Sequence, residues 1–148
     1  MTVLLDVNVL VALAWPNHIH HDLAVQWFDK QRARGWATCP VTQSGFVRVS
    51  SNRRVVPEAK SPAEAIAVLT QLTELEGHQF WPDDIEFTRS EFIDPSRIVG
   101  HGQVTDAHLV ALAVRHKGRL ATFDGNVTGV VPASLKSPHV LLVLARSR

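Results

Sequence analysis

The sequence predicts an α/β fold in which helices cover both faces of a mainly parallel sheet. Runs that are apolar and partly β-branched alternate along the chain with amphipathic helical segments. The first such run, residues 2–5, has the composition of a buried strand. No repeat, low-complexity tract or linker interrupts the alternation, so we expect one domain over residues 1–148.

Two helices are predicted after the first strand. Residues 9–15 are apolar and end at Pro16, because proline breaks a helix beyond its first turn. Residues 20–34 form a longer amphipathic segment, and Gly35 supplies its end.

The middle of the chain continues the alternation. We expect a strand over residues 36–40, a helix over 42–51, a polar loop over 53–60 and a helix over 61–76. The start of the last helix combines a capping serine, a proline suited to the first helical position and a glutamate that can close a capping box: Ser61, Pro62 and Glu64.

Three strands and one helix are predicted in the remaining sequence. The strands cover residues 79–81, 119–123 and 140–144, and an Ala- and Leu-rich helix covers 104–117. Residues 87–100 are expected to be surface structure.

Composition excludes several classes of protein. With 45% hydrophobic and 20% charged residues, the 148-residue chain is not expected to be disordered. Cys39 is the only cysteine, which excludes a disulfide scaffold and suits a reducing, cytoplasmic setting. No apolar run approaches the roughly 20 residues that span a bilayer. The net charge of +1 provides no global basic field for nucleic acid.

Three acidic residues occupy positions where ligands bind in parallel sheets. Asp6 ends the first strand, and Asp124 ends the strand over residues 119–123. Asp106 lies in the first turn of the helix over residues 104–117, where the helix dipole favours a carboxylate. Since ligands bind outside the carboxyl ends of the strands, these three acids can meet at one edge of the sheet.

Gathered carboxylates repel one another unless a cation binds among them. Mg²⁺ or Mn²⁺ prefers oxygen ligands and can activate water against a phosphodiester. Taken singly, each acid has an ordinary structural explanation: an aspartate before a helix is a cap, and Asp124-Gly125 can form a plain turn. Their joint occurrence favours a metal-dependent nuclease or phosphohydrolase.

Five segments carry a further pattern: LLDVNVL at residues 4–10, CPVTQSGFVRV at 39–49, FWPDD at 80–84, VTDAHLVALA at 104–113 and RLATFD at 119–124. Together and in this order they resemble the PIN-domain ribonucleases, and more closely the VapC toxins of bacterial toxin–antitoxin pairs. The first segment alone is a weak signal, whereas the ordered set is specific.

The resemblance implies a three-layer α/β/α sandwich with a site that uses Mg²⁺ or Mn²⁺ to cleave single-stranded regions of RNA. By motif position, Asp6 and Asp106 would be the main metal-binding residues, and Asp124 would complete the catalytic pocket. It also implies a homodimer and a cognate antitoxin that occupies the site. One position departs from the pattern: Gln43 stands where a glutamate is usual, and it adds no negative charge.

Other residues are candidates for supporting roles. Asn8 and Thr122 lie two residues from Asp6 and Asp124, where each can contact the site, although Asn8 can equally cap a helix and Thr122 can simply pack. Three arginines are candidates for binding RNA phosphates, with ordinary surface positions as the alternative: Arg48, Arg53 and Arg54.

The remaining motifs favour no other chemistry. His18, His20 and His21 match no tight zinc spacing, and no phosphate-binding glycine loop or nucleophile elbow is present. Trp15 and Trp27 are expected in the core or on an apolar surface that takes a partner helix.

We therefore predict a metal-dependent endoribonuclease that acts as the toxin of a toxin–antitoxin pair. One alternative is a non-catalytic or weakly catalytic PIN-like RNA-binding module, because Gln43 removes a charge from the site. A second alternative is a metal-dependent phosphohydrolase acting on a small substrate.

Overall fold

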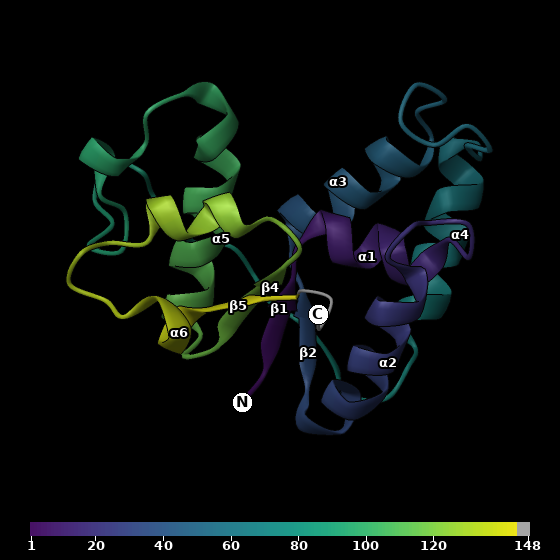
Figure 1. The fold of residues 1–148 in the computed structure, drawn as a ribbon, viewed down its shortest axis with the longest axis horizontal. Helices are drawn as coiled ribbons and strands as arrows, with labels where there is room; N and C mark the ends of the chain where they lie inside the picture. The colour runs from purple at the N-terminus through teal and green to yellow at the C-terminus, as the bar shows by residue number, and fades with distance from the viewer. Residues whose placement is uncertain (145–148) are drawn as a thin grey trace.

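A five-stranded, fully parallel sheet forms the centre of the structure, a computed structural model that describes residues 1–144 (Figure 1). The strand order is β3-β2-β1-β4-β5, so the first strand is central. The strands are β1 Val3–Leu5, β2 Trp36–Thr38, β3 His78–Phe80, β4 Arg119–Thr122 and β5 Leu141–Val143.

Helices cover both faces of this sheet, which makes three layers (Figure 1). One layer contains α1 Val7–Ala14, α2 His21–Gln31, α3 Pro40–Ser50 and α4 Pro62–Thr73. The other contains α5 Val104–Arg115 and α6 Ser137–Val140. Short 3₁₀ helices complete the elements: η1 Arg32–Arg34, η2 Pro95–Arg97, η3 His101–Gln103 and η4 Gly125–Val130. The predicted α/β/α sandwich is confirmed.

Each face of the sheet packs into its own hydrophobic cluster, because side chains alternate along a strand. In β1, Val3 and Leu5 belong to the cluster formed with α1 and α3, whereas Leu4 belongs to the cluster formed with α5. All three side chains are fully buried, which explains the purely apolar run before Asp6.

Two predicted helix starts were too late along the chain. Helix α1 begins at Val7 because Asp6 is its N-cap and accepts a hydrogen bond from the Val7 amide. Helix α3 begins at Pro40, which was predicted as the end of a strand. Proline at the first helical position is favourable, so the signal for this start was present in the sequence. The Ser61 cap of α4 was predicted correctly.

The tight turn into β3 gives a stability prediction. Gly77 has a φ of +86°, and a Cβ there would lie 1.9 Å from the Arg32 carbonyl oxygen. We expect Gly77→Ala to lower the free energy of unfolding by about 3 kcal/mol, from backbone strain and the forced shift of η1. Urea denaturation measures this loss. Gly102→Ala is the matched control, since a Cβ there meets nothing within 4 Å; an equal loss in both variants would contradict the explanation.

Candidate active site

The strand order reverses between β1 and β4, since β2 and β3 are added on one side of β1 and β4 and β5 on the other, which places the ends of these two strands at the switch point of the sheet. Leu5 pairs with Ala121, and the Asp6 amide donates to the Ala121 carbonyl over 2.9 Å. Asp6 therefore follows β1 directly beside the end of β4, and Asp124 lies two residues beyond that end. The predicted edge position of both acids follows from this pairing.

Asp6 is a buried carboxylate with both oxygens engaged. Its Oδ1 accepts from the Val7 amide (2.7 Å), and its Oδ2 accepts from the Thr122 hydroxyl (2.7 Å). Burial raises the pKa of Asp6; its two hydrogen bonds lower that pKa, and the nearby charge of Asp124 raises it. These contacts fix the orientation of the carboxylate at the sheet edge.

The Thr122 hydroxyl is the centre of a small hydrogen-bond network. It is fully buried, donates to Asp6, and accepts from Asn8 Nδ2 and from the Asp124 amide, both over 3.1 Å. A hydroxyl has one hydrogen and two lone pairs, so all its capacity is used. Asn8 also accepts from the Phe123 amide (3.2 Å). Asn8 is thus not a helix cap, and together with Thr122 it links α1 to the segment that carries Asp124.

Asp106 reaches the same region from the opposite layer of helices. It is half-buried in the first turn of α5 and accepts no hydrogen bond from residues 1–144. Burial, followed by the charges of Asp6 and Asp124, raises the pKa of Asp106 to about 6. This coupling places the three predicted acids within electrostatic reach of one another.

The donor chemistry of these acids fits a hard divalent cation. Within residues 1–144, no three or more His, Cys, Asp and Glu side chains are gathered closely enough to form a ready metal cluster. Mg²⁺ differs from zinc in this respect, because it is bound through one or two carboxylates and keeps several waters. Mutually repelling carboxylates, one of them without a hydrogen-bond partner in the described chain, are consistent with that mode.

Gln43 lies in the first turn of α3, which follows β2 at the same edge of the sheet. Its amide nitrogen donates to Thr38 Oγ1, and none of its hydrogen bonds reaches the three acids in the described residues. Its role as a site-supporting residue stays a prediction.

The three candidate RNA-binding arginines are not brought to the acids by any contact within residues 1–144. Arg48 is exposed in the last turn of α3, and Arg53 and Arg54 are exposed in the loop that follows. Figure 1 shows α3 leading away from the sheet toward this loop. Their role also stays a prediction.

Sequence reasoning missed an aromatic contact beside the acids. The ring of His20 stacks on Phe123, with centroids 4.6 Å apart, and Phe123 lies between Thr122 and Asp124. The ring centroids of His18 and His20 are 5.7 Å apart. These histidines match no zinc spacing in the sequence, and the contact joins residues that are 103 positions apart (123 − 20), so no local pattern indicated it.

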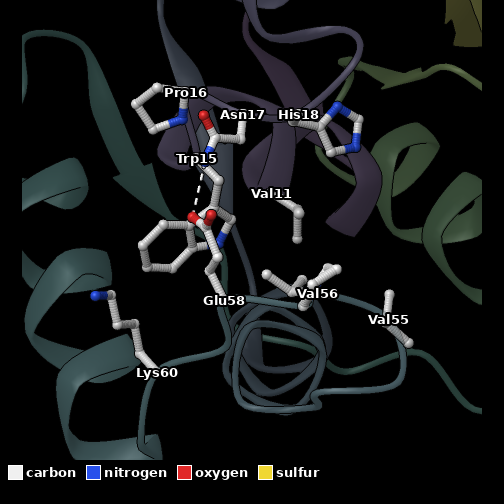
Figure 2. Close-up of a pocket in the computed structure, with 10 residues that line it drawn as sticks. Val11, Trp15, Pro16, Asn17, His18, Val55, Val56, Glu58 and Lys60 are labelled. Atoms are coloured by element: carbon white, nitrogen blue, oxygen red, sulfur yellow. Dashed lines mark hydrogen bonds between the residues drawn. The ribbon is translucent and has the colours of Figure 1, made fainter.

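A separate apolar pocket lies at the end of α1 and carries none of the three acids (Figure 2). Trp15 lines it and donates to Ser50, and Asn17 is joined to Glu58 across it by a 2.7 Å hydrogen bond. The other lining residues are Val11, Pro16, His18, Val55, Val56, Pro57 and Lys60. Trp15 thus borders an apolar surface, as predicted, whereas its binding of a partner helix stays a prediction.

The fold agrees with the comparisons with known proteins. Residues 3–130 match the PIN domain. The chain is 50% identical to Ribonuclease VapC39 of Mycobacterium tuberculosis over 135 residues, which cover 91% of this chain and 97% of that protein. It is 48% identical to Ribonuclease VapC38 of the same organism, with 95% and 98% covered. The chain therefore belongs to the PIN-domain family and, within it, to the VapC ribonucleases.

A solved structure shows the same fold at low sequence identity. The crystal structure of VapBC2 from Rickettsia felis, bound to a DNA fragment from its promoter, contains a chain that matches with a TM-score of 0.65. The match covers 98% of this chain and 100% of the other at 12% identity, so it supports the architecture alone. Among residues 1–144, no helix is long and apolar enough to cross a membrane.

Proposed function

We propose that this protein is a metal-dependent endoribonuclease that hydrolyses RNA phosphodiester bonds and acts as the toxin of a toxin–antitoxin pair. The observation that carries the proposal is the electrostatic coupling of Asp106 to Asp6 and Asp124, two acids that follow the adjacent strands β1 and β4 of a PIN-domain sheet. The identity of about half the residues with VapC ribonucleases over nearly the whole chain supports the same activity.

Asp6 and Asp106 would hold Mg²⁺ or Mn²⁺, and Asp124 would complete the set, through a water where needed. The bound cation supplies an activated water and neutralises charge that develops on the phosphodiester. Asp6 enters this set with its carboxylate oriented by Val7 and Thr122. Asp106 enters it without a competing hydrogen bond from residues 1–144, so its oxygens are available to the cation or its waters.

A purified-protein assay tests the proposal against the non-catalytic RNA-binding alternative. We expect cleavage of a single-stranded or hairpin RNA with Mg²⁺ or Mn²⁺ and none with EDTA. In Asp6→Asn, the rate of cleavage should fall by about 100-fold or more. Asparagine can still cap α1 through its oxygen, but its nitrogen cannot accept from Thr122, so circular dichroism checks that the variant is folded. Asp29→Asn, which changes an exposed aspartate of α2, is the matched control. RNA binding without cleavage in any metal would favour the alternative.

The remaining proposals concern partners. We propose a cognate antitoxin protein as the partner that inhibits the site, a homodimer as the assembly, and the cytoplasm as the compartment. They rest on membership of the VapC group. Copurification of the chain with the product of a neighbouring gene, and loss of RNA cleavage in that complex, tests the first of them.

A further inference from the structure

Two hydrogen bonds connect the first turn of α3 to the edge strand β3. Gln43 Nε2 donates to Thr38 Oγ1 over 3.0 Å, and Thr38 Oγ1 lies 2.8 Å from His78 Nε2. Thr38 is fully buried, whereas Gln43 and His78 are half-buried. We call the hydrogen-bonded series Gln43–Thr38–His78 the relay. None of the three acids takes part in it, so it is separate from the Thr122 network.

The hydrogen-bond capacity of Thr38 fixes the direction of the relay. Its oxygen accepts from Gln43, and its single hydrogen has His78 Nε2 as the remaining partner within residues 1–144. A Thr38 hydroxyl whose hydrogen is paired therefore requires a His78 ring that accepts at Nε2 and carries its proton on Nδ1. Burial lowers the pKa of His78, which favours the same neutral form.

Packing restrains the far end of the relay. The His78 ring lies 4.8 Å from the indole of Trp36, and Trp36 Nε1 donates to the Glu76 carbonyl over 2.8 Å. Trp36 is almost completely buried. His78 is therefore held against a fixed neighbour, and it can in turn fix the Thr38 hydroxyl.

The face of α3 that carries Gln43 meets α1, which begins directly after Asp6. Gln43, Phe46 and Ser50 are three and four residues apart and share that face. Phe46 stacks on Trp15, the C-cap residue of α1, and Ser50 accepts from the Trp15 indole. With its nitrogen tied to Thr38, the Gln43 amide has its oxygen as the free acceptor.

We infer that Thr38 and His78 are positioning residues that hold the nitrogen of the Gln43 amide on Thr38, which leaves the amide oxygen as an open acceptor at the carboxyl end of β2. An oxygen there accepts a hydrogen bond from water or from a ribose hydroxyl. A nitrogen there would donate and could not accept from water or from a ribose hydroxyl. The catalytic consequence rests on the proposed ribonuclease function, whereas the orientation itself does not.

The protonation of the His78 ring tests the orientation directly. In ¹⁵N-labelled protein, long-range ¹H–¹⁵N spectra of the parent chain are expected to show His78 protonated at Nδ1. In Gln43→Glu the carboxylate can only accept, so the Thr38 hydrogen turns toward it and His78 must donate from Nε2. A parent chain with the proton on Nε2, or an unchanged His78 tautomer in Gln43→Glu, would overturn the inference.

Kinetics tests the consequence. Thr38→Val keeps the shape of the side chain but removes the hydroxyl, and we expect kcat to fall about tenfold with KM unchanged. The kcat of Gln43→Ala should fall by a similar factor, and the kcat of the double variant Thr38→Val/Gln43→Ala should be no lower than that of either single variant. Thr38→Ser, which keeps the hydroxyl, should retain activity. If the kcat losses of the two single variants multiply in the double variant, or if only KM changes, the relay is contradicted. If the parent chain cleaves no RNA, the proposed function fails, and the tautomer of His78 still decides the orientation.

Discussion

Asp106→Asn is expected to abolish RNA cleavage and, in the absence of metal at pH 7, to make the protein more stable than the parent chain. Asparagine has the same shape, and Asp106 accepts no hydrogen bond from residues 1–144 that the change would break. The substitution removes one of three mutually repelling charges. The substitution is therefore expected to lower activity by removing a proposed metal-binding carboxylate and to raise stability by relieving repulsion.

The pH dependence follows from the raised pKa. Burial and the charges of Asp6 and Asp124 raise the pKa of Asp106 from 3.8 to about 6, so the folded state binds more protons than the unfolded state between these values. The stability of the metal-free parent chain should therefore fall as the pH rises from about 4 to 6, and this part of the fall should be absent in Asp106→Asn. Because the side chain is half exposed, we expect only about 1 kcal/mol, or about 3 °C in Tm, at pH 7.

Thermal unfolding in EDTA from pH 4 to pH 8 measures the effect. Asp29→Asn is the control, since this exposed aspartate is remote from the acidic edge in sequence and makes no ion pair in the described chain. Adding Mg²⁺ should raise the Tm of the parent chain more than that of Asp106→Asn. An Asp106→Asn protein that is less stable than the parent chain in EDTA at pH 7 would contradict the proposed repulsion.

The positions of the acids could be predicted because they depend on a general property of parallel sheets. Asp6 and Asp124 each end an apolar run, and in the structure those runs are adjacent strands, β1 and β4. The helix that carries Asp106 was recognisable from its Ala- and Leu-rich sequence and from the glycine after it. Local sequence thus indicated which acids lie at the edge, and the strand order makes the two acid-bearing strand ends neighbours.

The relay through Thr38 and His78 could not be predicted, since it depends on the register of two strands. Trp36 pairs with His78 and Thr38 pairs with Phe80, which brings the His78 ring beside the Thr38 hydroxyl. A shift of one residue would turn His78 to the other face of the sheet. The strand over residues 79–81 was predicted one residue late, and that error alone placed His78 outside the strand.

Thr122→Val is expected to damage both the fold and the site, because three hydrogen bonds meet at one buried hydroxyl. Valine fills the same space but leaves Asp6 Oδ2, Asn8 Nδ2 and the Asp124 amide without this partner. We expect a loss of about 2 kcal/mol in the free energy of unfolding and a 10- to 100-fold loss of RNA cleavage, roughly. Urea denaturation and the cleavage assay measure the two losses, and Thr122→Ser, which keeps the hydroxyl, should restore most of both.

The pH dependence separates the Thr122 bond to Asp6 from the other two bonds of this network. The Thr122 hydrogen bond lowers the pKa of Asp6 against the effect of burial, so its removal raises that pKa further. Since the lost bond is strongest to the ionised carboxylate, the stability deficit of Thr122→Val should grow as the pH rises past the pKa of Asp6 and be smallest near pH 4. The acidic limb of the cleavage profile should move to higher pH. A deficit independent of pH would mean that the Thr122 bond to Asp6 contributes little and that the loss comes from the bonds of Asn8 and the Asp124 amide; the orientation of Asp6 would then depend on the Val7 amide.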